Sequence, residues 1–232
     1  MNPADTHHNT AIRVLVVDAI EPLALSLVAA LRAAGHHVTT HARQDSDQAD
    51  VHAHDLSTSL ERIEQQFGPF NRIVFACLPA RELIEEPADI WRKQAELSLA
   101  LAELQAAARL LCRQELGQIW VLLPEDGMRH YLDVPAQPVR SRALMAAVKS
   151  LAKEVHSLGL RINALQIQTL AEQVAPEAWP PARPWLKAYA LRFKPLPCAH
   201  VARFILALLT QATLPLSGMV IPIGIGFPEN NI

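Results

Sequence analysis

The sequence is poor in several residues and patterns that mark common classes of protein. Its 232 residues include three cysteines, Cys77, Cys112 and Cys198, and no two of them form a C-x-x-C pair. We therefore predict free thiols in a reducing compartment rather than a disulfide framework. The formal net charge is only −2 and no polybasic run is present, so neither a nucleic acid nor a membrane is expected as a partner.

Long hydrophobic runs are missing as well, and we expect no leader sequence. No apolar run reaches the ~18–20 residues of a membrane span. Residues 1–11, MNPADTHHNTA, are too polar for a signal peptide, and we interpret them as a disordered tail. The chain is 50% hydrophobic, so residues 12–232 are enough for a single domain with one sizeable core. These features predict a cytoplasmic protein.

Apolar, β-branched runs alternate with helical patterns through this domain. Strand patterns fall at Arg13–Val17, His37–His41, Arg72–Ala76, Gln118–Leu123, Arg161–Gln166 and Met219–Ile223. Helical patterns fall at Leu23–Ala34, Ser57–Phe67, Ile90–Glu115, Val139–Leu158 and Ala199–Gln211. This alternation predicts an α/β fold, in which helices cover both faces of a parallel sheet. Residues 170–198 differ, because they are rich in proline; we expect a lid or short helical insertion there, in which Trp179 and Trp185 could line an apolar cleft.

Glycine is also scarce, and none lies in the turn of the first strand–turn–helix unit, VLVVDAIEPLA. This layout is typical of dinucleotide-binding folds, in which glycines let backbone N–H groups approach a pyrophosphate at a helix N-terminus. Asp18 would instead repel a phosphate, and Pro22 lacks an N–H group. Pro22 suits the first position of a helix, and Asp18 or Glu21 can accept its free N–H bonds. We favour a self-capped structural turn over a new phosphate site.

Five stretches of the chain together resemble one protein family. They are VLVV followed by LALSLVAALRAAGHHVTTHAR, then HDLST, FGPFNRIVFACLPA, ALMAAVKSLAKEVHSLGLRINAL and SGMVIPIGIG. In order and spacing they resemble the short-chain dehydrogenase/reductase (SDR) family, and within it the ketoacyl-thioester reductases. The resemblance runs from about Ile12 to Gly226. It implies a Rossmann-like, doubly wound parallel sheet in three layers.

The positions that carry the family's chemistry depart from its pattern. At the cofactor site, the three glycines of the phosphate turn align with Asp18, Pro22 and Ala24, and the motif N-N-A-G aligns with Phe75, Ala76, Cys77 and Leu78. At the catalytic site, the structural asparagine aligns with Ser98, the serine with Pro124, the tyrosine with Gln137 and the lysine with Ser141. The family's late Pro-Gly pair aligns with Ile167 and Gln168. This alignment predicts a degenerate member with no catalytic residues.

The loss of the catalytic pair does not depend on the alignment. The family's reaction requires Tyr-x-x-x-Lys, because the lysine lowers the pKa of the tyrosine so that the phenol can exchange a proton near neutral pH. The chain has two tyrosines. Four residues after Tyr131 comes Pro135, and four residues after Tyr189 comes Phe193. The motif is therefore absent from the sequence.

Two aligned positions and a group of histidines are candidates for ligand binding. The resemblance places Arg43 where the family often contacts the 2′-phosphate of NADP, and Asp55 where it contacts the adenine. We favour the alternative of a surface arginine and a helix-capping aspartate, so we expect no cofactor, or NADP if any binding survives. Five histidines cluster in the sequence, at His36, His37, His41, His52 and His54, but no cysteine or carboxylate spacing completes a metal site. No metal is expected.

The best-preserved stretches are two helices, at about residues 90–115 and 139–158. In the family, the corresponding helices form a four-helix interface between subunits. We therefore predict a homo- or hetero-oligomer, and a function as a non-catalytic or structural subunit that pairs with an active SDR oxidoreductase of acyl-thioester ketoreductase type. One alternative is a divergent NADP-dependent oxidoreductase with an atypical active site. A weaker alternative is a sensor that binds a ligand or nucleotide in the vacated cleft.

Overall fold

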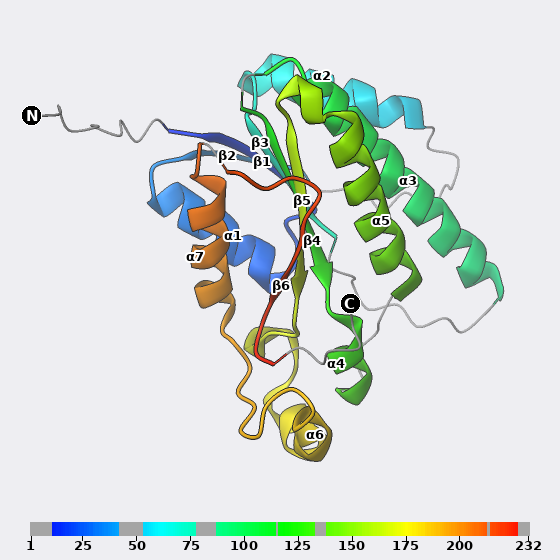
Figure 1. Ribbon diagram of the computed structural model, residues 1–232, viewed down its shortest axis with the longest axis vertical. Coiled ribbons are helices and arrows are strands. Elements are labelled where there is room, and N and C mark those ends of the chain that lie inside the picture. The colour runs from blue at the N-terminus through cyan, green and yellow to red at the C-terminus, as the bar shows by residue number, and fades with distance from the viewer. Residues whose placement is uncertain are drawn as a thin grey trace, which may run out of the picture.

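The structure, a computed structural model, forms one parallel sheet with helices on both faces (Figure 1). It describes residues 11–41, 53–77, 87–114, 116–132, 138–212 and 214–226, leaving aside the side chains of residues 53–59 and 87–93. The α/β class, the parallel sheet and its flanking helices confirm the predicted fold class.

Six strands make up the sheet in the described part of the chain. They are β1 (Arg13–Val17), β2 (His37–His41), β3 (Arg72–Ala76), β4 (Gln118–Pro124), β5 (Arg161–Ile167) and β6 (Val220–Ile223). Their order is β2-β1-β3-β4-β5-β6, and every neighbouring pair is parallel. The direction of winding reverses between β1 and β3. The predicted strands agree with the observed ones to within one residue at each end.

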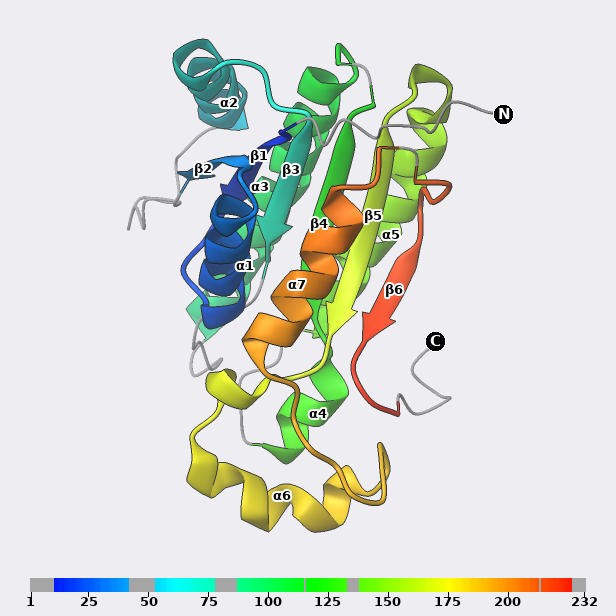
Figure 2. The ribbon, with the colours of Figure 1, turned by 90° about the vertical axis from the view of Figure 1, so that its left-hand side faces the viewer.

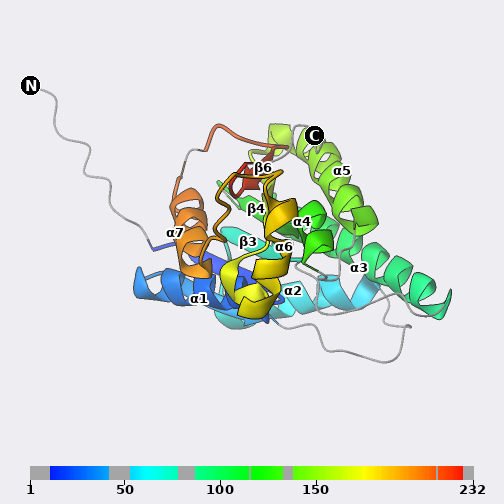
Figure 3. The same cartoon turned by 90° about the horizontal axis from the view of Figure 1, so that it is seen from below.

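Alternating side chains divide the core into two apolar layers. Leu15 and Val17 of β1 face one layer, which includes side chains of α2 (Ala53–Phe67), α3 (Pro87–Leu111) and α5 (Pro138–Glu154). Val14 and Val16 face the other layer, which is covered by α1 (Pro22–Ala33) and α7 (Cys198–Leu209). Seen along the sheet, the two helical layers lie on opposite sides of the strands (Figure 3). The strands are apolar on both faces because both faces are buried.

Two helices that the sequence analysis did not place lie beyond the carboxyl ends of the strands (Figure 2). They are α4 (Asp126–Tyr131), directly after β4, and α6 (Trp179–Leu186), which lies within the proline-rich segment together with 3₁₀ turns at Ala171–Gln173 and Pro176–Ala178. A small apolar cluster joins them, including Met128 of α4 and Leu186 of α6. The proline-rich segment is thus a short helical insertion that packs against the domain.

At the amino ends of the strands, one buried arginine connects several segments by hydrogen bonds. Arg72, the first residue of β3, is 3% exposed, and its guanidinium donates to the carbonyl oxygens of Leu209 (3.0 Å), Leu116 (2.6 Å) and Asn71 (2.9 Å). Burial lowers its pKa to about 10, so it remains charged at neutral pH. The positive charge at Leu209 also complements the dipole at the C-terminal end of α7.

Among the described helices, none combines the length and the apolar character needed to cross a bilayer. Cys77 and Cys198 are buried free thiols, and Cys112 is a partly buried one.

Candidate functional site

In open α/β sheets, ligands bind beyond the carboxyl ends of the strands, where the winding reverses. In this chain that region lies next to Val17, Ala76, Pro124 and Ile167, the last residues of β1, β3, β4 and β5 (Figure 2). We call this region the strand-end edge. Among the described residues, the connections that leave it include the β1–α1 turn, the start of α4 and the segment after β5.

The β1–α1 turn uses its backbone groups internally. Asp18 has a left-handed backbone, with φ 58°, and its N–H donates to the carbonyl oxygen of His41 at 2.8 Å. Pro22 is the first residue of α1, as the sequence analysis expected. Glu21 occupies the N-cap position, but its side chain makes no capping hydrogen bond. Of the two expected capping residues, Asp18 and Glu21, Glu21 therefore does not cap the helix, and its carboxylate interacts elsewhere.

That interaction is with Arg129, on the helix that follows β4. Glu125 starts this helix, since its carboxylate accepts from the N–H groups of Gly127 (2.9 Å) and Met128 (2.8 Å). The helix places Arg129 at the strand-end edge, where its side chain is 4% exposed. Asp126, Glu21 and Glu125 all attract its guanidinium. Because Glu21 belongs to the β1–α1 turn, this ionic network joins the β1 and β4 sides of the edge.

Burial and charge oppose one another in this network. Burial raises the pKa of Glu21 above its ordinary value, and the nearby Arg129 partly offsets the shift. Burial also raises the pKa of Glu125, against the effect of the two N–H groups that it accepts from. The pKa of Arg129 is lowered by burial, while Asp126, Glu21 and Glu125 favour its charged form. Opposite charges thus favour the charged forms of Glu21 and Arg129 against burial, whereas backbone N–H groups do so for Glu125.

Tyr189 completes the network from the segment after α6. Its side chain is 6% exposed, and its hydroxyl donates to the Glu125 carboxylate. Burial, together with the charge of Glu125, raises the pKa of Tyr189 far above its ordinary value. Phe193 stands where a lysine would follow in Tyr-x-x-x-Lys, and its ring packs edge-on against Tyr189 at 6.3 Å. Tyr189 therefore keeps its proton near neutral pH and is unsuited to acid–base catalysis.

The β5 and β6 sides of the edge are closed by a glutamine. Gln168 is 3% exposed, and its side-chain amide donates to the carbonyl oxygen of Ile225 (3.0 Å) and accepts from the N–H of the same residue (2.7 Å). Beyond it, Gly226 has φ 58°, and a Cβ atom there would overlap the carbonyl oxygen of Tyr189. The segment after β6 thus packs directly on the backbone that carries Tyr189.

The other described positions that align with the family's motifs lie within helices, strands or the apolar core. Ala24, Phe75, Ala76 and Cys77 are buried in the two apolar layers. Ser98 is exposed, and its hydroxyl donates to the carbonyl oxygen of Gln94 in the same helix at 3.0 Å. Pro124 is the last residue of β4, and Ser141 is buried in α5. Arg43, Leu78, Gln137 and the side chain of Asp55 lie outside the described residues.

The tryptophans and histidines form no ligand cluster in the described part of the chain. Trp179 stacks on Phe193 at 6.2 Å, whereas Trp185 is 63% exposed. No three side chains of the metal-binding types lie together among the described residues, which exclude His52 and the side chain of His54.

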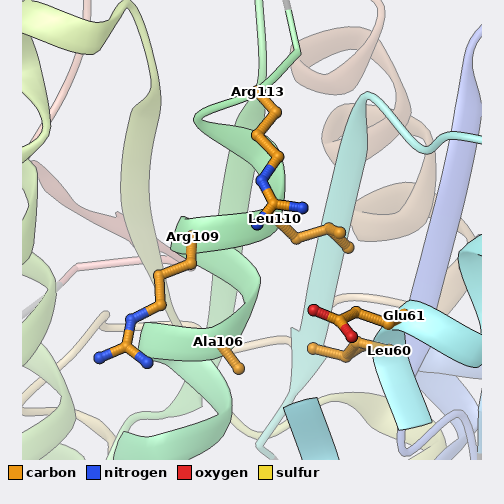
Figure 4. Close-up of a pocket in the computed structure, with 6 residues that line it drawn as sticks. All are labelled: Leu60, Glu61, Ala106, Arg109, Leu110 and Arg113. Atoms are coloured by element: carbon orange, nitrogen blue, oxygen red, sulfur yellow. The ribbon is translucent and has the colours of Figure 1, made fainter. Parts of the chain in front are cut away.

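Two surface cavities of the described residues lie away from the strand-end edge. One, of about 230 Å³, lies between α2 and α3; Leu60, Ala106 and Leu110 line it together with Glu61, Arg109 and Arg113 (Figure 4). The other, of about 310 Å³, is bounded by α5 and the segment before β6, including Lys149, Lys153 and Gly218. Neither cavity includes a residue of the ionic network.

The sequence analysis missed this network. The acidic pair Glu125-Asp126 after a strand is a signal for a helix start and could have predicted α4. No local signal shows that Arg129 reaches Glu21, because that interaction depends on how β1 and β4 lie in the sheet.

Comparisons with known proteins found similar structures but no curated protein with a similar sequence. No family model matches the chain, and no curated protein matches its sequence. A double variant of a Serratia marcescens short-chain dehydrogenase/reductase superposes with a TM-score of 0.69 at 18% identity, over 93% of this chain and 97% of that one. A dehydrogenase/reductase from Sinorhizobium meliloti gives 0.68 at 14% identity, over 93% and 94%. The chain therefore has the SDR fold.

Proposed function

We propose that this chain is a non-catalytic protein of the SDR fold, which serves as a structural subunit beside an active SDR oxidoreductase of acyl-thioester ketoreductase type. The observation that carries the proposal is the ionic network of Arg129, Glu21 and Glu125. It lies at the strand-end edge, where an active relative would hold its cofactor and substrate.

The residues at this edge do not fit a nicotinamide dinucleotide. A pyrophosphate needs free N–H groups and a positive helix terminus, but the N–H of Asp18 donates to His41 and Pro22 has none. The carboxylate of Glu21 lies at the same terminus. At reduced dielectric, repulsion between such a carboxylate and a phosphate costs several kcal/mol. We therefore expect no cofactor binding.

The helices α3 and α5 support the pairing role. Leu97, Leu101 and Ala106 of α3 are only partly buried, although they contact the core. On α5, Ala147 is partly buried and Ala146 is exposed. Small residues allow two helices to approach closely. A second subunit that covers this face would bury these side chains, and we propose that the partner binds here.

Co-expression tests the pairing. The chain is produced with a tag beside an SDR enzyme encoded in the same genome, and we expect the two to co-purify at a fixed ratio. Ala146→Arg places a charge on the proposed interface and should abolish co-purification. Ala29→Arg makes the same change at an exposed position of α1, on the opposite face, and should not. Failure to co-purify with any such enzyme would contradict the partner role.

NADPH fluorescence tests the lack of a cofactor site. Micromolar protein should leave the emission of NADPH unchanged, with an active SDR enzyme as the positive control. Enhanced or quenched emission would contradict the non-catalytic assignment and support the alternative of a divergent NADP-dependent oxidoreductase.

A further inference from the structure

One stretch of the chain concentrates exposed positive charge. Between residues 183 and 194, RPWLKAYALRFK, there are four basic residues and no acidic one, although the whole chain has a net charge of −2. All four basic side chains, Arg183, Lys187, Arg192 and Lys194, are exposed. The nearest acidic residue before them in the chain is Glu177. We call these residues the 183–194 surface.

The same surface exposes two large apolar side chains. Trp185 is 63% exposed and Leu191 is 88% exposed. Tyr131 of α4, itself 38% exposed, stacks parallel to Trp185 with ring centroids 6.2 Å apart. These side chains contribute little to the core, so packing does not explain why they are apolar.

The surface is firmly attached and lies at one end of the molecule. On its inner side, Ala182, Leu186 and Tyr189 are buried against Met128. Figure 2 shows α6 at the end of the molecule beyond the carboxyl ends of the strands, and Figure 3 looks onto this end. A flat partner can therefore reach α6 without contacting the helices that cover the sheet.

We propose that the 183–194 surface docks the protein on an anionic lipid bilayer. Basic residues around exposed Trp and Leu side chains are the pattern of interfacial membrane binding, in which the ring lies at the level of the headgroups. Each basic residue near such a surface strengthens binding about fivefold. An acidic protein would also attract the charges, but neither described cavity includes these residues to receive its side chains.

This inference is independent of the proposed subunit role, and it departs from the expectation that no membrane partner exists. That expectation rested on the absence of a run of consecutive basic residues. Here the basic residues are separated in sequence by up to five positions, and the short helix with its following turn brings them to one end of the protein.

Vesicle flotation with the full chain tests the proposal. We expect binding to vesicles of mixed phosphatidylcholine and phosphatidylserine, no binding to phosphatidylcholine alone, and release at high salt. Lys187→Gln with Arg192→Gln should weaken binding about 25-fold. Arg32→Gln with Arg203→Gln removes the same charge from exposed positions on α1 and α7 and should have no effect.

Trp185→Ser and Leu191→Ser distinguish insertion of apolar side chains into the bilayer from electrostatic attraction to its headgroups alone. Each should weaken binding to anionic vesicles while the circular dichroism spectrum and melting temperature stay unchanged, because both side chains are exposed. Equal binding to phosphatidylcholine vesicles with and without phosphatidylserine would contradict the proposal. So would an equal loss of binding in the Arg32→Gln/Arg203→Gln control and the Lys187→Gln/Arg192→Gln variant. Binding to an immobilised acidic polypeptide but to no vesicle would show that the partner is an acidic protein instead.

Discussion

The guanidinium of Arg129 and the carboxylate of Glu21 attract one another across the strand-end edge, and neither side chain is fully exposed to water. One residue belongs to the helix after β4 and the other to the turn after β1. Their interaction therefore links the connection after β1 with the connection after β4.

A double-mutant cycle should detect this link. Arg129→Met removes the cation beside the buried Glu125 and the partly buried Glu21 and Asp126, and should lower the free energy of unfolding by about 3–5 kcal/mol. Glu21→Gln should cost less, and the double variant should be more stable than the sum of the single changes predicts. Urea denaturation measures all three. Arg109→Met, at an exposed position of α3, should change stability by no more than ~0.5 kcal/mol. Strictly additive effects would contradict the interaction.

Glu125 should make stability depend on pH. Its pKa is raised in the folded protein, mainly by burial, so the folded state binds more protons than the unfolded state between the two pKa values. Stability from this group therefore rises as the pH falls from neutral toward 5. Urea titrations of the native chain and Glu125→Gln at pH 7 and 5 should show the native chain gaining stability relative to the variant. A relative loss at pH 5 would reverse the inferred sign.

Arg72 should be difficult to replace. Arg72→Met leaves the carbonyl oxygens of Leu209 and Leu116 without their buried donor and should cost about 3 kcal/mol in urea denaturation. Arg72→Lys should recover only part of this, since an ammonium cannot reproduce the forked geometry. Arg13 also donates to a carbonyl oxygen, that of Phe67 at 3.3 Å, but from an exposed position. Arg13→Met should cost under about 1 kcal/mol, and an equal cost at both sites would refute the role of burial.

Gly226 should tolerate no side chain. Gly226→Ala combines an unfavourable backbone with overlap of its Cβ atom and the Tyr189 carbonyl, and should cost at least ~2 kcal/mol. Gly159→Ala provides a matched control, because Gly159 has φ 77° with nothing within 4 Å of the added atom. It should cost only ~1–2 kcal/mol from the backbone. Melting temperatures compare the two, and similar losses would show that the C-terminal segment yields freely.

Short-range patterns were sufficient for most of the fold. Each strand is a compact apolar run, and such runs are buried on both faces of a parallel sheet. The helix ends were less accurate: the helix predicted over Ile90–Glu115 ends at Leu111, and that over Val139–Leu158 ends at Glu154 before a 3₁₀ turn. Residues 112–114 and 155–158 leave these helices toward the next strand.

The site was less accessible to sequence analysis. The missing glycines and the missing Tyr-x-x-x-Lys are local features, and they were recognised directly. The helix α6 is expected only as a lid or short helical insertion without bounds, because Pro180, Pro181 and Pro184 argue against a helix; the first two lie in its first turn, where no N–H donor is needed. Glu21 and Tyr189 come from parts of the chain distant from Glu125 and Arg129, and only the folded protein brings them together.

The link between Arg129 and Glu21 also sets a rule for redesign. A variant in which Glu21 is replaced, so that the β1–α1 turn no longer repels a phosphate, would leave Arg129 buried with one fewer counter-charge. Replacement of Arg129 alone would leave Glu21 to repel the phosphate. Each single step is therefore unfavourable, and an engineer who wants a dinucleotide-binding version of this scaffold must change both segments in the same variant.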